Sequence, residues 1–325
     1  MLIGMPLVEL QNYQPTLTKK ADFEDFWSNT LKINIDLQPK VTLVREISPI
    51  DQFDIFDLTV EGFNREPIKG WFISPKNLSS PQPTMVSYDG YGGGRGNPQE
   101  WLYWPSCGFP TIVMDTRGQG GGYRRADTPD GSYPRDSQAS GFMTMGILNP
   151  ETYYYRRVFA DAVAFIRAAK QLPNVDSSRI ITVGGSQGGG ISIAATALSG
   201  EVFATMPDVP FLCHYQRAIE MVDTYPYQEI VNYCKIHRSK VLEVMSTLSY
   251  FDCMNFASIT KAPALFSVGL HDPVCPPETI YAAINHWQGP TEVQVWSFNT
   301  HEGGGSDNQL VQAEWIKKKL SQAQS

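Results

Sequence analysis

The hydrophobic positions change their period along the chain. Residues 20–32 carry large apolar side chains at helical spacing, which predicts a peripheral amphipathic helix. Three following segments alternate polar with apolar residues or run apolar, and turn-forming residues separate them. They predict a set of antiparallel strands over 41–48, 53–61 and 66–74.

From residue 83 onward, short apolar segments alternate with helical patterns. The predicted strands cover 83–88, 109–115, 178–185, 262–269 and 291–298. The predicted helices cover 151–171, 186–200, 276–287 and 308–320. Strands that alternate with helices form βαβ units, so the pattern predicts an α/β fold with a doubly wound, mostly parallel sheet.

Residues 213–256 interrupt this alternation with helix-like stretches rich in Tyr, Met and His. The segment lies between two predicted strands, so we expect a helical insertion over one end of the sheet. A length of 325 residues allows one large domain or two ordinary ones. Because the strand–helix alternation is otherwise unbroken, it predicts one domain over 1–325.

Charge and cysteine content exclude several classes of protein. Lys and Arg total 26 against 33 Asp and Glu, and a net charge of −7 argues against nucleic-acid binding. No stretch approaches 18 apolar residues, and the N-terminus shows no signal-peptide pattern, so we expect no membrane contact. The five cysteines are odd in number, and none forms a CxxC pair. They predict a cytoplasmic protein with reduced thiols and no metal site.

The strongest local motif is Gly184-Gly185-Ser186-Gln187-Gly188, which matches G-x-S-x-G. It lies where a predicted strand meets a predicted helix, as a nucleophile elbow requires. The alternative is a glycine-rich turn with an incidental serine. The strand–helix context favours Ser186 as a nucleophile.

A serine nucleophile needs a base, and the base needs an orienting carboxylate. On folds with a nucleophile elbow the chain order is Ser, then acid, then His, and all five histidines follow Ser186. Asp272 and His301 both follow predicted strands, whereas His286 lies inside a predicted helix, where packing explains it. We therefore assign Ser186 as nucleophile, Asp272 as acid and His301 as base.

Two competing assignments stay open at this point. His271 could be the base, although no carboxylate then lies at an obvious strand end between Ser186 and His271. Glu302 could be the acid, but adjacent side chains rarely face one another, so the alternative is that Glu302 orients the loop or faces solvent.

Two glycine-rich loops complete the candidate site. Residues 88–94 follow a predicted strand, and they suggest an oxyanion hole formed by the backbone N–H groups of Tyr91 and Gln187. A flexible turn is the alternative. The second loop begins at residues 117–120. It does not match the phosphate-binding motif G-x-G-x-x-G over 118–123, because position 123 is Tyr rather than Gly. We expect Arg117, with its five fixed donors, and Gln119 to give structural support to these loops.

These motifs together resemble a known family. TRGQG (116–120), GGSQGGG (184–190), HD-VCPP (271–277) and THEGGG (300–305) are similar to the acetyl xylan esterase / cephalosporin C deacetylase family, carbohydrate esterase family 7. The resemblance covers essentially the whole chain. It implies an α/β-hydrolase fold, a triad at Ser186, Asp272 and His301, and oxyanion donors at Tyr91 and Gln187.

The resemblance also implies an activity and a setting. The expected enzyme is a serine esterase that deacetylates small acetylated substrates, such as xylo-oligosaccharides and cephalosporin C-type esters. It would be an intracellular, ring-like hexamer without metal or cofactor. Two positions depart from the family pattern: Asp89 stands where His is usual, and His271 where Met is usual. We expect them to affect leaving-group preference and the pH profile.

Other functions are disfavoured. A peptidase resembling the prolyl oligopeptidase group would be expected to carry a bladed, repetitive N-terminal domain, and no repeats are visible. A broad carboxylesterase on the same fold is a further alternative. A non-catalytic module would have lost a member of the triad, yet Ser186, Asp272 and His301 are all present.

Overall fold

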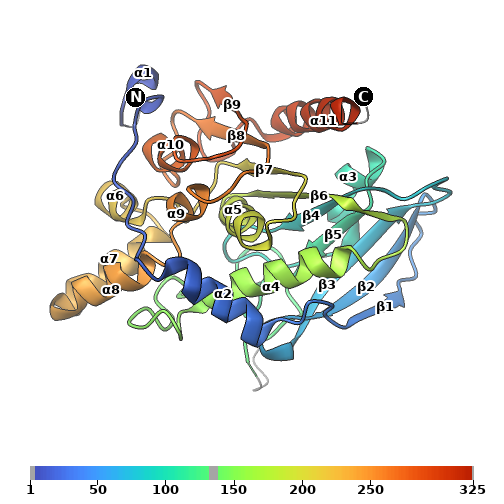
Figure 1. Ribbon diagram of the computed structural model, residues 1–325, viewed down its shortest axis with the longest axis horizontal. Helices are drawn as coiled ribbons and strands as arrows, with labels where there is room; N and C mark the ends of the chain where they lie inside the picture. Colours follow the sequence, from blue (N-terminus) through green and yellow to red (C-terminus); the bar gives the residue numbers. More distant parts are fainter. Residues whose placement is uncertain (1–3, 132–137, 324–325) are drawn as a thin grey trace.

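One nine-stranded sheet runs through the molecule in the order β1-β2-β3-β5-β4-β6-β7-β8-β9 (Figure 1). The computed structural model describes residues 4–131 and 138–323, so the domain expected over 1–325 includes three short segments outside the described residues. The strands are β1 (Val41–Arg45), β2 (Phe53–Glu61), β3 (Pro67–Pro75), β4 (Gln82–Tyr88), β5 (Thr111–Met114), β6 (Val175–Gly185), β7 (Ala204–Asp208), β8 (Ala264–Gly269) and β9 (Thr291–Trp296).

The pairing of these strands agrees with the sequence pattern. Strands β1, β2 and β3 are antiparallel to one another, and β3 is antiparallel to β5. From β5 through β9 every neighbouring pair is parallel. All residues of β5 and β8 are buried, because parallel strands in such a sheet are covered on both faces. The prediction of a mostly parallel sheet with N-terminal antiparallel strands is confirmed.

Helices cover both faces of the sheet. Apart from the helices between β7 and β8, the longer ones are α2 (Phe23–Asn34), α4 (Tyr154–Ala169), α5 (Gln187–Ser199), α10 (Pro277–Ile284) and α11 (Gly305–Gln322), and α1 (Leu7–Leu10) and α3 (Tyr103–Ser106) are short. Side chains of α2, α4, α5 and α10 share one hydrophobic core, and those of α3 and α11 belong to another. Adjacent residues of β4 point to different cores, since Val86 lies in the first and Met85 in the second.

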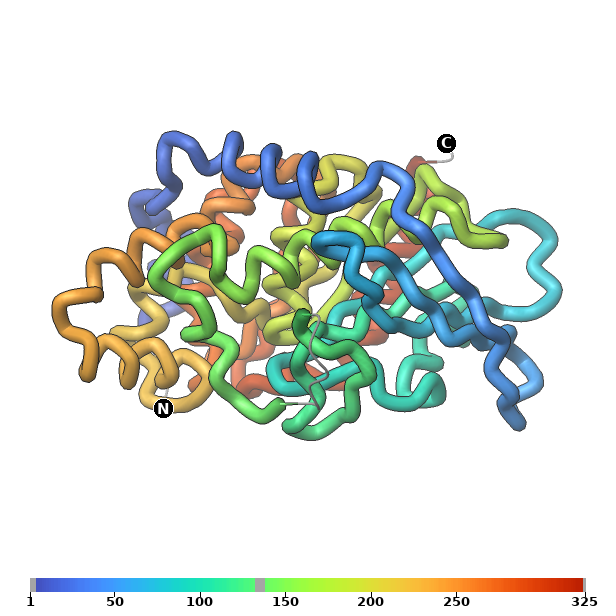
Figure 2. Tube along the Cα trace, turned by 90° about the horizontal axis from the view of Figure 1, so that it is seen from below, coloured from blue at the N-terminus to red at the C-terminus, as the bar shows by residue number. Residues whose placement is uncertain are grey.

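The predicted N-terminal helix is present as α2. Its spacing buries Phe23, Trp27 and Leu31 on one face. Figure 2 shows α2 running along the outside of the molecule, beside segments that are distant in sequence. Trp27 donates to the carbonyl of Tyr250 at 2.8 Å, and Arg156 of α4 donates to Thr30 Oγ1 at 3.0 Å. These hydrogen bonds hold α2 against α4 and against the chain around Tyr250.

The expected helical insertion lies between β7 and β8. Its helices are α6 (Tyr215–Met221), α7 (Tyr227–Ile236), α8 (Val241–Leu248) and α9 (Cys253–Ala257). The helices α7 and α8 project at one end of the molecule (Figure 1). Tyr225 and Pro226, which immediately precede α7, line the same cavity as Ser186, so the insertion contributes to the candidate site.

The sequence pattern did not predict β7. This strand is only five residues long and ends in Pro-Asp, but it pairs in parallel with both β6 and β8. Its conformation therefore depends on long-range partners more than on local propensity. Within residues 4–131 and 138–323, no helix is long and apolar enough to cross a membrane.

Candidate active site

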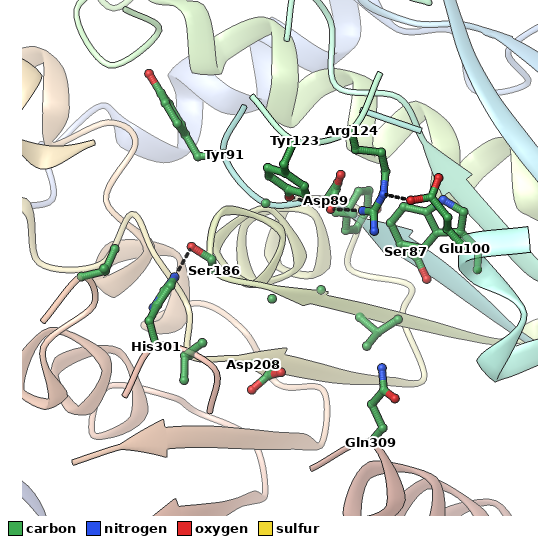
Figure 3. Close-up of a pocket in the computed structure, with 18 of the residues that line it drawn as sticks. Ser87, Asp89, Tyr91, Glu100, Tyr123, Arg124, Ser186, Asp208, His301 and Gln309 are labelled. Atoms are coloured by element: carbon green, nitrogen blue, oxygen red, sulfur yellow. Dashed lines mark hydrogen bonds and ion pairs between the residues drawn. The ribbon is translucent and has the colours of Figure 1, made fainter. Parts of the chain in front are cut away.

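Ser186 occupies a strained turn between β6 and α5. Its backbone angles are φ 54° and ψ −118°, a conformation that non-glycine residues rarely adopt. The Ser186 N–H donates to the carbonyl of Asp208 at 2.9 Å, which anchors the turn on the neighbouring strand β7. A side chain at Gly188 would collide with the carbonyl of Tyr88, so glycine is needed where α5 approaches β4. The serine hydroxyl consequently faces the cavity at the carboxyl ends of the strands (Figure 3).

The structure brings Ser186, His301 and Asp272 together. His301 Nε2 lies 2.9 Å from Ser186 Oγ, and His301 Nδ1 lies 2.8 Å from Asp272 Oδ2. Asp272 follows β8 and His301 follows β9, so three loops from one sheet edge supply the three side chains. His301 lies between Ser186 and Asp272, which is the arrangement that the assigned roles of nucleophile, base and acid require.

The carboxylate of Asp272 is held in a fixed orientation. It is fully buried, and its Oδ1 accepts backbone N–H groups of Val274 at 2.8 Å and Cys275 at 2.9 Å. These two bonds leave Oδ2 for the imidazole of His301. A buried carboxylate in this position fixes the orientation of the ring and favours a proton on Nδ1.

The competing residues lie elsewhere. His286 Nε2 contacts the carbonyl of Pro15 at 2.7 Å, which is a packing role. No described residue forms a hydrogen bond with the ring of His271. Glu302 accepts Thr300 Oγ1 at 2.5 Å and Asn299 Nδ2 at 2.8 Å, and these bonds lower the pKa of its carboxyl to about 2. Glu302 therefore orients the loop that carries His301.

Two backbone N–H groups lie near Ser186: that of Tyr91, which lines the cavity, and that of Gln187, the next residue in the chain. The N–H groups of Tyr91 and Gln187 donate to no described residue, which leaves both available to an incoming oxygen. The side chain of Gln119 supports this arrangement, because its Oε1 accepts the Gly92 N–H at 2.7 Å and its Nε2 donates to Gln187 Oε1 at 2.8 Å. Gln187 Oε1 also accepts the hydroxyl of Tyr155 at 2.8 Å. The loop after β4 is thus tied to the first turn of α5.

Arg117 links several loops from a buried position. Its guanidinium donates to both carboxylate oxygens of Asp161, at 2.6 and 2.9 Å, and to Glu66 at 2.5 Å. A further bond to Asp130 measures 3.3 Å. These carboxylates raise the pKa of Arg117 above its already high ordinary value, against the opposing effect of burial. The side chain lies in no part of the cavity lining, so its position is that of a structural support.

The cavity above Ser186 has a volume of about 750 Å³. Figure 3 shows Ser186 and His301 on one side and Tyr123, Arg124 and Glu100 on the other. Asp208 also lines it, and burial raises the pKa of that carboxyl to about 6. Its Oδ1 accepts the hydroxyl of Ser267.

Of the polar groups opposite Ser186, the sequence analysis singled out Asp89 but missed Arg124 and Glu100. Arg124 Nη1 donates to Asp89 Oδ1 at 2.8 Å, and Arg124 Nε donates to Glu100 Oε1 at 3.0 Å. These residues belong to the glycine-rich loops or to segments just beyond them. The loops themselves were the available signal, but their mutual contact depends on the sheet order.

Asp272, Cys275 and His301 are the described residues whose arrangement could hold a metal ion. One candidate ligand atom from each lies within 4.8 Å of the others. Two of these side chains already bond one another, and burial raises the pKa of the Cys275 thiol well above its ordinary value. A cysteine binds a metal as the thiolate, so this environment favours the hydrogen-bonded arrangement over metal binding.

The sheet order and the strand–Ser186–helix turn define an α/β-hydrolase fold. The acylaminoacyl peptidase of Pyrococcus horikoshii shares this fold, with a TM-score of 0.58, 16% identity, and coverage of 84% of this chain and 42% of that chain.

Closer relatives indicate the family. The family model for acetyl xylan esterase (AXE1) matches residues 1–319, and the chain belongs to that family. The acetyl xylan esterase from Paenibacillus sp. R4 is 39% identical, with a TM-score of 0.87 and coverage of 97% of this chain and 99% of that one. The acetyl xylan esterase 1 from Thermoanaerobacterium sp. JW/SL YS485 is 29% identical, with a TM-score of 0.85 and coverage of 95% and 97%. Acetyl esterase Axe7A of Xylanibacter ruminicola is 25% identical over 336 residues, which cover 94% of this chain and 69% of the relative. The protein is a carboxylic ester hydrolase.

Proposed function

We propose that this protein is a serine esterase that removes acetyl groups from small acetylated substrates through an acetyl-serine intermediate. The observation that carries the proposal is the continuous contact from Ser186 Oγ to His301 and on to Asp272, at 2.9 and 2.8 Å. The family supports the ester-hydrolase class. Acetylated xylo-oligosaccharides and cephalosporin C-type acetyl esters are the proposed substrates.

The first half of the reaction transfers the acetyl group to the enzyme. His301 Nε2 accepts the proton of Ser186 as Oγ attacks the acetyl carbonyl carbon. The negative charge that develops on the carbonyl oxygen receives hydrogen bonds from the N–H groups of Tyr91 and Gln187. The carbon–oxygen bond to the alcohol then breaks, and the alcohol leaves with the proton from His301.

The second half releases acetate. A water molecule gives a proton to His301 and attacks the acetyl-serine carbonyl, and the same two N–H groups stabilise the oxyanion. Ser186 Oγ leaves and recovers the proton from His301. Asp272 stays ionised throughout and stabilises the imidazolium that forms in each half.

The direct test is acetate release from 4-nitrophenyl acetate by the purified protein. We expect Ser186→Ala to abolish turnover, with the far-UV circular dichroism spectrum unchanged. Full activity in this variant would contradict the proposed nucleophile. Faster turnover of butyrate or longer esters than of acetate would contradict the deacetylase assignment.

The resemblance also supports a proposed setting. We propose that the protein acts in the cytoplasm as a hexamer. The five cysteines are all free, which is typical of a reducing compartment. Light scattering on the purified protein tests the assembly, with an expected mass about six times the 36.3 kDa of one chain.

A further inference from the structure

The active-site cavity extends from Ser186 to a polar cluster formed by Asp89, Arg124 and Glu100 (Figure 3). We propose that Arg124 is a specificity-determining residue that binds hydroxyl groups on the alcohol part of a neutral acetylated sugar. This inference rests on the proposed function and assigns the part of the site that holds the leaving group.

The position of Arg124 suits contact with the alcohol part. It lines the same cavity as Ser186 and His301 but lies across from them (Figure 3). An acetyl group has only two carbons, and its carbonyl carbon must lie against Ser186 Oγ for attack. Most of the cavity of about 750 Å³ is therefore left for the alcohol. Arg124 is part of the wall that the alcohol would contact.

The guanidinium of Arg124 is fixed before any substrate binds. Nη1 donates to Asp89 Oδ1 at 2.8 Å, and Nε donates to Glu100 Oε1 at 3.0 Å. Its central carbon lies 4.6 Å from the ring centroid of Trp101, and Asp89 Oδ1 also accepts the hydroxyl of Tyr123 at 3.0 Å. Because these contacts set the plane of the guanidinium, little side-chain entropy is lost when a ligand binds.

Arg124 still has donors to offer. A guanidinium carries five N–H groups, and the two carboxylates use one on Nε and one on Nη1. No described residue accepts from Nη2. The Arg124 side chain is 21% exposed and that of Glu100 is 38% exposed, so both reach the cavity. A sugar hydroxyl can accept from Nη2 and donate to Glu100, whereas a simple alkyl alcohol can use neither group.

The charge of the lining favours a neutral alcohol over an anionic one. Among the described lining residues, Asp89, Glu100 and Asp208 supply three carboxyl groups, and Arg124 is the one guanidinium or ammonium group. Two of the carboxylates already pair with Arg124. A carboxylate on the alcohol part would thus enter a region of net negative charge. Of the two proposed substrate classes, the site therefore favours acetylated neutral sugars over cephalosporin C-type esters, whose alcohol part carries a carboxylate.

The first test compares two acetates in the wild type and in Arg124→Gln. The substrates are an O-acetylated methyl xyloside and 4-nitrophenyl acetate, whose alcohol part has no sugar hydroxyls. Hydrogen bonds to charged groups contribute enough that the ratio of sugar to aryl kcat/KM should fall about 10- to 100-fold, mainly through the sugar KM. Arg124→Lys keeps the positive charge but loses the planar arrangement of N–H donors, so it should give a smaller fall in the same ratio.

Arg125→Gln is the matched control. Arg125 is exposed, donates to Asn97 Oδ1 at 3.0 Å and lies outside the cavity lining, so the ratio should stay within twofold of the wild type. A ratio that also stays within twofold in Arg124→Gln would overturn the inference.

A second test uses charge and does not depend on Arg124 variants. The wild type should cleave the acetylated methyl xyloside at least about tenfold more efficiently than an acetylated methyl glucuronide, which carries a carboxylate. Glu100→Gln should narrow that preference, because it removes one negative charge and keeps a side chain able to accept the Asn97 N–H. Equal or better cleavage of the glucuronide by the wild type would overturn the inference.

The same measurements separate this inference from the proposed function. If the wild type cleaves neither sugar acetate nor aryl acetate, the esterase proposal itself fails. If it cleaves both in a Ser186-dependent way and Arg124→Gln leaves their ratio unchanged, only the assignment of Arg124 fails.

Discussion

The side-chain amides of Gln119 and Gln187 bond one another at 2.8 Å, although 68 positions separate them. Both residues are fully buried. Through Gly92, Gln119 also holds the loop that carries Tyr91, at 2.7 Å. The amide pair therefore sets the spacing between the two backbone N–H groups proposed to bind the oxyanion.

We predict that Gln119→Leu lowers kcat for 4-nitrophenyl acetate by about 10²- to 10³-fold, the cost of losing one oxyanion donor. The substitution leaves the Gly92 N–H without its acceptor, so the Tyr91 loop should shift away from α5. Gln171→Leu is the matched control, because this exposed glutamine bonds the carbonyl of Pro39 and does not line the cavity. Equal kcat values for the two variants would contradict the role of the amide pair.

Asp272→Asn should lower kcat by about 10⁴-fold while the structure around Ser186 is retained. The amide would disturb the proton position on His301 that the carboxylate favours. The adjacent His271→Ala should retain activity within about twofold, because the cavity lining does not include His271. Steady-state kinetics with one aryl acetate compares the two variants. A large loss of kcat in His271→Ala would indicate that His271, rather than His301, is the base.

Arg117→Met should destabilise the protein by about 3–5 kcal/mol, since it leaves the buried carboxylate of Asp161 without its cation. Burial already raises the pKa of Asp161, so the unpaired group is costly to keep charged. Arg45→Met removes the exposed ion pair with Asp54 and should cost about 0–1 kcal/mol. Urea unfolding measures both, and similar values for the two variants would contradict the structural role of Arg117.

Asp208 makes a pH-dependent contribution to stability. Its pKa is raised by burial from 3.8 to about 6 in the folded state, so the folded chain holds this proton after the unfolded chain has released it. The associated stability is present below about pH 4 and is lost as the pH rises to about 6. Asp208→Asn lacks this titration. The free energy of unfolding of this variant, relative to that of the wild type, should increase by about 2 kcal/mol between pH 4 and 7. A pH-independent difference in urea unfolding would contradict the raised pKa.

The sequence determined most of the elements and the order of the reactive groups. Local periodicity located α2 and the strand β6 that precedes Ser186, because α2 buries one face and the second half of β6 is an apolar run that is largely buried. Chain order and strand ends selected Ser186, Asp272 and His301 from the available residues. The structure places these side chains in mutual contact. Local patterns suffice here because an α/β sheet brings its carboxyl ends to one edge.

Only the tertiary structure decided how the loops meet. The strand β7 depends on its neighbours β6 and β8, and no local pattern marks it clearly. The pairing of Asp89 with Arg124 joins residues 35 positions apart that follow adjacent strands, and it forms only when β4 and β5 lie side by side. The hydrogen bond between Gln119 and Gln187 depends on the same sheet. Such contacts depend on side-chain geometry across the folded sheet edge, a property that periodicity and chain order do not encode.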